Sequence, residues 1–263
     1  MEDCHGPWNH RPQAIICASS RGLGRACAFA LAQAGCEVVI NGRDTKALET
    51  TAAELRRATS ARVKAVAADV ATAEGQAALL NASPEPDILV NNNAGPPFRD
   101  FRQLTRAQMI DGVIANMVVA VELAQKVIDP MVSRKFGRIV NITSGSVKMP
   151  LAGLDLSSGA RAGLTAFLAG VARSVAASNV TINFLLPGTF DTERLQSNIM
   201  ANAKNKGIPY DQAKAERMAT VPAKRFGTPD EFGAACAFLC SAQAGYITGQ
   251  NILIDGGAFP GAM

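Results

Sequence analysis

A short glycine-rich segment has the composition and position of a phosphate-binding turn. Gly22 and Gly24 follow the apolar run 14–18, and the Ala/Leu-rich segment 26–34 comes next. Glycine lets a phosphate approach the backbone N–H groups at a helix start, where the helix dipole is positive. A strand, a glycine turn and a helix in this order are the context that a dinucleotide site requires. The segment therefore predicts a site for a nucleotide phosphate.

Seven short apolar runs could form the strands that position this turn, and helix-length segments separate them. The runs are 14–18, 37–41, 63–67, 87–90, 137–142, 180–186 and 251–254. The clearest helical segments are 26–34, the one that Asp44 or Thr45 can cap, 104–131 and 159–177. Alternating strands and helices predict an α/β fold, with a doubly wound (Rossmann), mostly parallel seven-stranded sheet and helices on both faces. Such sheets bind ligands beyond the carboxyl ends of their strands.

The chain shows no internal repeat, no low-complexity tract and no second-domain boundary. We therefore expect one domain over residues 13–263, preceded by a flexible N-terminal arm over residues 1–12. This arm lacks the basic-then-apolar layout of a secretory signal. The stretch from about 190 to 224 is polar and rich in Met and Lys, and it is expected to be helical and to cover a substrate as a lid.

Composition excludes several classes of protein. Hydrophobic residues make up 48% and charged residues 18%, which is typical of a globular protein. The net charge of +4 comes from scattered basic residues, so neither nucleic acid nor a membrane surface is an expected partner. The six cysteines form no C-x-x-C pair and the two histidines lie in the arm, so no metal site is expected. Because no uninterrupted apolar stretch is long enough to span a bilayer, we expect a soluble cytoplasmic protein with reduced thiols.

Several motifs in a shared order resemble the short-chain dehydrogenase/reductase family from about Gln13 to Gly257, and β-ketoacyl-acyl-carrier-protein reductase-like members above all. The glycine turn resembles T-G-x-x-x-G-x-G, with Ala18 in place of the first glycine. Asp69-Val70, Asn92-Asn93-Ala94-Gly95, and Pro187-Gly188 followed by Thr192 resemble later family segments, although the three asparagines at 91–93 leave the register open by one residue. The cofactor-binding residues that the resemblance implies, with the arginines discussed below, are Ala18, Ser20, Arg21, Gly22, Leu23, Gly24, Arg43, Asp69, Val70, Asn92, Asn93, Ala94, Gly95, Arg161, Pro187, Gly188 and Thr192.

Charge near the second strand bears on which cofactor is bound. NAD enzymes usually place an acidic residue there to hold the ribose hydroxyls, whereas NADP enzymes place a cation. The second run ends in Asn41-Gly42-Arg43, without an acid, and Arg21 lies within the phosphate turn. We expect Arg21 and Arg43 to hold a 2′-phosphate, which favours NADP(H), with NAD(H) possible. The alternative is that both are ordinary surface arginines.

The resemblance also implies a catalytic set, and this chain departs from it. Asn116 and Ser144 match the family's Asn and Ser, whereas the positions of its catalytic Tyr and Lys hold Ser157 and Arg161. A serine hydroxyl is shorter and much less acidic than a phenol, and arginine is not a base. The predicted catalytic residues are therefore Ser144, Asn116, Ser157 and Arg161, with the proton donor unassigned. Tyr210 and Lys214 fit Y-x-x-x-K literally but fall in the expected lid.

Three functions remain open from the sequence. The first is an NADP(H)-dependent oxidoreductase that reduces a carbonyl or oxidises an alcohol without the usual Tyr and Lys. The others are a non-catalytic nucleotide-binding protein and a non-redox enzyme on the same fold. The expected substrate is a small, moderately apolar molecule, because apolar residues recur in the lid at Leu195, Ile199, Met200, Ile208, Met218 and Val221. The resemblance implies a homodimer or homotetramer that pairs through helices 104–131 and 159–177.

Overall fold

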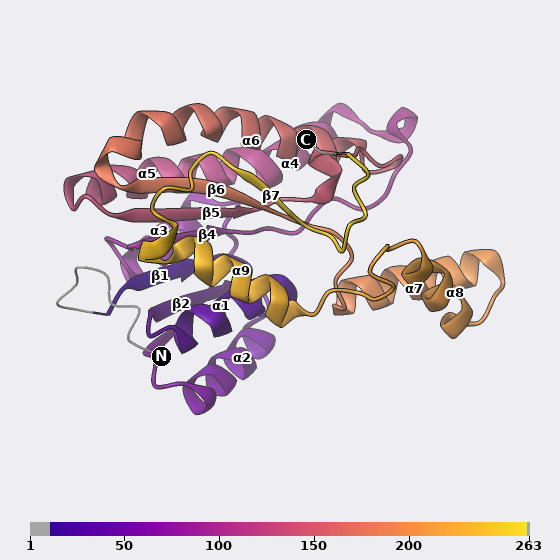
Figure 1. Cartoon of the computed structure of the whole chain (residues 1–263), viewed down its shortest axis with the longest axis horizontal. Helices are drawn as coiled ribbons and strands as arrows, with labels where there is room; N and C mark the ends of the chain where they lie inside the picture. The colour runs from indigo at the N-terminus through magenta and orange to yellow at the C-terminus, as the bar shows by residue number, and fades with distance from the viewer. Residues whose placement is uncertain (1–10, 262–263) are drawn as a thin grey trace.

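The computed structural model describes residues 11–261, so most of the expected N-terminal arm, with His5 and His10, lies outside the described residues. Its centre is a seven-stranded sheet in the order β3-β2-β1-β4-β5-β6-β7 (Figure 1). All of its strand pairings are parallel. The strands are β1 Gln13–Ile16, β2 Glu37–Gly42, β3 Val63–Ala67, β4 Ile88–Asn91, β5 Gly137–Ile142, β6 Val180–Pro187 and β7 Asn251–Ile254. The predicted doubly wound α/β fold is confirmed.

Helices cover both faces of this sheet and bury two apolar cores. Cys27, Leu48 and Phe232 belong to the core under α1, α2 and α9, whereas Leu79, Leu123 and Leu168 belong to the core under α3, α5 and α6. The helices are α1 Gly22–Gln33, α2 Thr45–Ala58, α3 Ala73–Ala82, α4 Arg106–Val113, α5 Val119–Ser133, α6 Asp155–Val175, α7 Glu193–Lys206, α8 Tyr210–Ala219 and α9 Pro229–Cys240. Short 3-10 turns span Phe101–Gln103, Gly145–Val147, Ala176–Ser178 and Ala242–Ala244.

The long helix predicted over 104–131 is continuous but irregular. A π-helical segment, Ile114–Val118, joins α4 to α5. The combined helix, Arg106–Ser133, is long and apolar enough by length and composition to cross a membrane. However, Leu123, Val127 and Met131 are buried against the sheet, as in the core helix of a globular domain. Packing against the sheet thus explains part of its apolar character, whereas Met109, Ile110, Val113 and Ile114 of the same helix are exposed.

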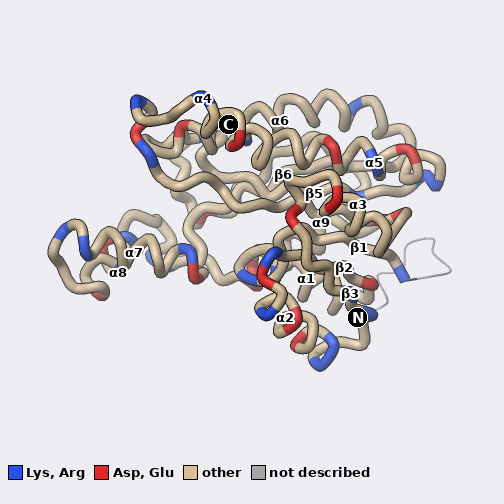
Figure 2. The backbone as a smooth tube through the Cα atoms, turned by 180° about the vertical axis from the view of Figure 1, so that it is seen from behind, with Lys and Arg blue, Asp and Glu red and all other residues tan. Residues whose placement is uncertain are grey.

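Two helices stand apart from the layers. Figure 1 shows α7 and α8, in orange, projecting from the body of the fold beyond the end of β6. They have a small core of their own around Ile199, Ala203, Ala213 and Phe226. Basic and acidic residues are interspersed on them and on α2 (Figure 2). The predicted helical character of 190–224 is thus confirmed, and we call α7 and α8 with their connecting residues the lid.

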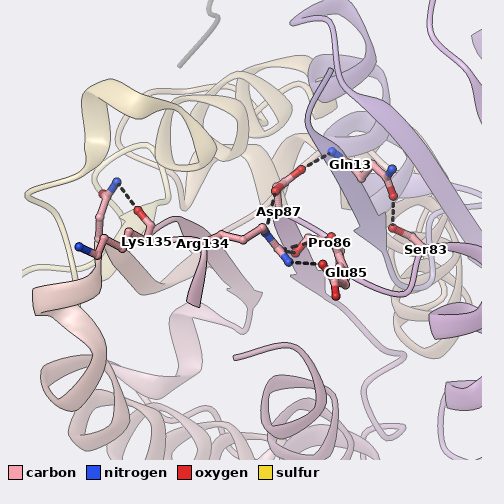
Figure 3. Close-up of polar contacts among 8 residues, drawn as sticks. Gln13, Ser83, Glu85, Pro86, Asp87, Arg134 and Lys135 are labelled. Atoms are coloured by element: carbon pink, nitrogen blue, oxygen red, sulfur yellow. Dashed lines mark hydrogen bonds and ion pairs between the residues drawn. The ribbon is translucent and has the colours of Figure 1, made fainter. Parts of the chain in front are cut away.

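A polar network joins the amino-terminal ends of β1 and β4 to the end of α5 (Figure 3). Arg134 donates to Oε2 of Glu85 at 2.9 Å and to the Pro86 carbonyl at 3.1 Å. Asp87 accepts a hydrogen bond from the backbone N–H of Gln13 at 2.8 Å. These contacts lie at the amino-terminal ends of the strands. The lid lies at the opposite side, after the carboxyl end of β6.

Candidate functional site

A cleft of about 520 Å³ lies between the carboxyl ends of the strands and the lid. It is large enough for a small organic ligand. Many of the predicted site residues line it: Leu23, Asn92, Asn93, Gly95, Ser144, Ser157, Arg161, Pro187, Gly188 and Thr192. The other predicted site residues do not border this cleft: Ala18, Ser20, Arg21, Gly22, Gly24, Arg43, Asp69, Val70, Ala94 and Asn116.

The glycine turn has a backbone that explains its sequence. Ala18 and Gly22 adopt left-handed φ values of 45° and 59°. Glycine takes this conformation without penalty, whereas an alanine there is strained by about 1–2 kcal/mol. Two asparagines hold Ala18 in place: its N–H donates to Oδ1 of Asn41 at 3.2 Å, and its carbonyl accepts from Nδ2 of Asn92 at 3.1 Å. The predicted first strand therefore ends at Ile16 rather than at residue 18, because the chain turns at Ala18.

The second glycine of the turn is required by close packing. A Cβ atom on Gly24 would lie 2.4 Å from the carbonyl oxygen of Ala18, far inside contact distance. The backbone of the turn therefore lies directly against the first turn of α1. This close approach of turn and helix is what a phosphate cradle needs.

Helix α1 also begins without a side-chain cap. Its N-cap residue, Arg21, makes no capping hydrogen bond, and its first turn holds no acidic residue. By contrast, Asp44, Thr72 and Thr192 cap α2, α3 and α7. The first N–H groups of α1 thus lack a side-chain acceptor, and a phosphate would supply one. This geometry fits the diphosphate of a dinucleotide.

The two arginines predicted to bind a 2′-phosphate are both paired with carboxylates. Arg21 donates to Asp44 at 2.8 Å and approaches Glu193 at 3.5 Å, while Arg43 lies 3.5 Å from Asp69. All of these side chains are substantially exposed, so the ion pairs are weak and a phosphate can compete for them. Asn41 is buried, and its amide donates to the carbonyls of Val66 and Ala68. Its side chain therefore supports the turn.

Three predicted catalytic side chains meet at the cleft. Ser144, after β5, accepts a hydrogen bond from the N–H of Ser146 at 3.1 Å. Ser157, on α6, accepts one from Nε of Arg161 at 3.2 Å. Because both hydroxyl oxygens already accept an N–H, each O–H proton can be donated elsewhere. The structure thus provides two oriented hydroxyl donors.

Arg161 is a charged side chain that is buried in the wall of the cleft. It is only 7% exposed and donates to the carbonyls of Ile142 at 2.8 Å and Asn93 at 3.4 Å. Burial, followed by the nearby charge of Arg194, lowers the pKa of Arg161 to about 10. The guanidinium therefore stays charged at neutral pH. No carboxylate among residues 11–261 lies within 4.0 Å of it.

Asn116 lies behind the cleft in the π-helical segment. Its amide donates to the carbonyl of Gly112 at 3.1 Å, and its Oδ1 is buried without a hydrogen-bond partner among the described residues. It lines a cavity of about 20 Å³ that Asn93 and Arg161 also border. A cavity of this volume can hold one water molecule. Asn116 is therefore next to Arg161 but separate from the main cleft.

The lid contributes fewer apolar contacts to the cleft than the sequence indicates. Leu195 and Val221 line it, whereas Ile199 and Met218 pack within the lid and Met200 is 57% exposed. Tyr210 begins α8 and packs against the lid core, away from the cleft lining.

Sequence reasoning missed the two lid arginines in the cleft, Arg194 and Arg217, and it also missed Asp255. The sequence held one signal for Arg194: it follows the predicted site residue Thr192 by two positions, so its place in the cleft could have been expected.

Comparisons with known proteins agree with this architecture. The sequence model of the family described as Enoyl-(Acyl carrier protein) reductase matches residues 17–258. The 3-oxoacyl-[acyl-carrier-protein] reductase FabG of Vibrio cholerae is 31% identical over 94% of this chain and 96% of its own length. The NADPH-dependent reductase BacG of Bacillus subtilis is 29% identical over 93% and 96%. L-sorbose reductase from Gluconobacter frateurii, solved with NADPH and L-sorbose, has a TM-score of 0.90 at 28% identity, covering 95% of this chain and 97% of its own. The chain belongs to the short-chain dehydrogenase/reductase family.

Proposed function

We propose that this protein is an NADP(H)-dependent oxidoreductase that interconverts a carbonyl compound and an alcohol. The observation that carries the proposal is the cleft itself, in which Leu23, from the uncapped first turn of α1, lies with Ser144, Ser157 and Arg161. The relatives named above include reductases described as NADPH-dependent or solved with NADPH. The coarser function, a reductase of the NAD(P)-dependent kind, follows from the same comparisons.

The proposal assigns the cofactor to the residues predicted from the sequence. The turn from Ala18 to Gly24 would hold the diphosphate, Arg21 and Arg43 would hold the 2′-phosphate, and Pro187 and Gly188 would contact the nicotinamide. Asp69-Val70 would contact the adenine, and Asn92 to Gly95 and Thr192 would complete the cofactor site. When bound, the nicotinamide supplies or accepts the hydride.

Ser157 and Arg161 replace the usual Tyr and Lys in this proposal. The hydroxyls of Ser144 and Ser157 hold the substrate oxygen, and the nearby charge of Arg161 stabilises negative charge that develops on it. The proton reaches that oxygen through one of these hydroxyls and is replaced from water, with Asn116 supporting the replacement. Because a serine hydroxyl is a weaker acid than a phenol, turnover is slower by about 10²–10⁴ than with a positioned general acid.

A second candidate is a nucleotide-binding protein without redox turnover. Two observations at the positions of the expected Tyr and Lys favour it. The hydroxyl oxygen of Ser157 accepts a hydrogen bond from Arg161, and no tyrosine of the described residues lines the cleft. This candidate shares the cofactor site with the first and differs from it in turnover alone.

Assembly and location remain predictions. A homodimer or homotetramer is supported by large apolar side chains exposed on α4, the π-helical segment and α6, namely Met109, Ile110, Val113, Ile114 and Phe167.

The first experiment titrates the purified chain with NADPH and with NADH and follows nicotinamide fluorescence. We expect NADPH to bind at least tenfold more tightly than NADH. A screen of carbonyl compounds for NADPH oxidation then separates the two candidates. Tight NADPH binding without oxidation of any substrate would favour the non-catalytic protein, and absence of binding by either nucleotide would overturn both.

A further inference from the structure

Three arginines line the cleft from two parts of the fold. Arg161 comes from α6, while Arg194 and Arg217 come from the lid helices α7 and α8. A Cβ atom built on Gly95 would lie 3.3 Å from Nη2 of Arg194 and 3.5 Å from Nη2 of Arg161. These two charged groups therefore meet over the same glycine, and the charge of Arg194 lowers the pKa of Arg161.

None of the three arginines has a carboxylate partner among residues 11–261. Arg194 makes no hydrogen bond to a described residue, and Arg217 donates to the hydroxyl of Thr189 at 3.3 Å. Arg161 is buried, whereas Arg194 and Arg217 are exposed. The facing charges of Arg161 and Arg194 repel each other unless an anion lies between them. The cluster is therefore built to receive negative charge from a ligand.

The one acidic residue that lines the cleft does not neutralise this cluster. Both oxygens of Asp255 accept backbone hydrogen bonds, from Gly257 at 2.9 Å and from Phe259 at 2.8 Å. No arginine or lysine nitrogen of the described residues lies within 4.0 Å of the carboxylate. The cleft thus keeps a net positive charge, which draws anions toward it.

The rest of the cleft wall is largely apolar. Phe98, Met149, Leu151, Leu154 and Phe259 line it. A ligand that fits both the arginines and the apolar wall has an oxyanion and an apolar body. Arginine is suited to the oxyanion because its planar N–H groups match carboxylate and phosphate geometry.

We propose that Arg161, Arg194 and Arg217 form an oxyanion-binding site and that the substrate is an anionic carbonyl compound with an apolar body, such as an aryl or alkyl oxo acid. The assignment of the oxyanion to a substrate rests on the proposed function, whereas the site itself does not. In the reaction, hydride passes from NADPH to the carbonyl carbon and a proton from water passes to the carbonyl oxygen. The products are the hydroxy acid and NADP⁺, and the oxyanion is unchanged.

Binding can be measured without turnover, because an oxo acid and NADP⁺ are both oxidised. The probes are phenylpyruvate, its neutral methyl ester and inorganic phosphate, each titrated calorimetrically into the full chain with and without NADP⁺. We expect phenylpyruvate to bind at least tenfold more tightly than the ester, and phosphate to compete with it. Equal binding of acid and ester, or binding of neither acid nor phosphate, would overturn the site.

Variants separate a substrate oxyanion from the diphosphate of the cofactor. We expect Arg194→Met and Arg217→Met each to weaken phenylpyruvate binding by about tenfold or more, with NADPH affinity unchanged. Arg173→Met, an exposed arginine elsewhere on α6, is the matched control and should change neither affinity. Weaker NADPH binding with unchanged phenylpyruvate binding would assign the arginines to the cofactor and overturn the proposal. Phenylpyruvate binding without NADPH oxidation would instead count against the proposed reaction alone.

Discussion

The Nε–H of Arg161 donates to the hydroxyl oxygen of Ser157, one helical turn earlier on α6, across 3.2 Å. This contact joins the two residues that we expect in place of the family's catalytic Tyr and Lys. It fixes the serine oxygen as an acceptor and leaves its proton free for a ligand. It also directs a buried positive charge along the wall of the cleft.

Restoring the family's residues should change the rate of reduction. We expect Ser157→Tyr combined with Arg161→Lys to raise kcat for NADPH-dependent ketone reduction by about 10²-fold, since a phenol is a far better acid than a serine hydroxyl. Ser157 borders a cleft of about 520 Å³, which gives a tyrosine ring room. The measurement is NADPH oxidation by the double variant, with each single variant as control. An unchanged rate would show that the pocket is not shaped for a phenol.

Cofactor preference should depend on Arg43. Its weak, exposed ion pair with Asp69 leaves it available to a 2′-phosphate. We expect Arg43→Met to weaken NADPH binding by about tenfold and to leave NADH binding unchanged, because only NADPH carries that phosphate. Fluorescence titrations of both nucleotides measure this. Arg62→Met, another exposed arginine with a carboxylate partner, is the control. Equal losses for the two nucleotides would argue against a role in selecting NADPH.

Two glycines should respond in opposite ways to the same substitution. Gly24→Ala would place a Cβ 2.4 Å from the Ala18 carbonyl, so we expect a loss of about 1–3 kcal/mol in the free energy of unfolding and weaker NADPH binding. Gly170→Ala, inside α6, would place its Cβ more than 4 Å from any atom outside the neighbouring helix backbone, and it should gain about 0.5–1 kcal/mol because glycine disfavours helix interiors. Urea unfolding measures both. A stable Gly24→Ala variant would mean that the turn can rearrange.

The junction between the lid and α9 should be sensitive to acid. Hydrogen bonds from Arg225, at 2.6 Å and 2.8 Å, and from the backbone of Thr228 lower the pKa of Glu231 from 4.5 to about 2. The carboxylate therefore stabilises the fold fully above pH 4.5, and this contribution is lost as pH falls through about 2.

We expect Glu231→Gln to lower the urea midpoint at pH 7 and the difference from the native chain to shrink steadily below pH 4.5. Unfolding curves collected between pH 7 and pH 2.5 test this. Glu49→Gln, whose ion pair with Arg56 spans 3.9 Å, is the control. A difference that stays constant over this range would show that the substitution acts through something other than charge.

Much of the fold was predictable because its signals are local. Near-continuous apolar runs such as 137–142 identify buried parallel strands, and the glycines at 22 and 24 identify the phosphate turn. The order of motifs likewise predicted that Ser157 and Arg161 lie in one cleft with Ser144. Helix ends were less certain: α1 begins at Gly22 rather than at residue 26, and a π-helical segment interrupts the helix predicted over 104–131.

The sequence alone determined the sheet, the glycine turn and which residues we expect in place of the family's Tyr and Lys, because each depends on neighbours along the chain. Tertiary structure decided what those residues contact. That Asn92 and Asn41 hold Ala18, that Arg194 and Arg161 meet over Gly95, and that Arg217 lines the same cleft depends on segments far apart in the sequence. Burial and net local charge arise only when such segments pack together, so the charge of the cleft could not be predicted from composition.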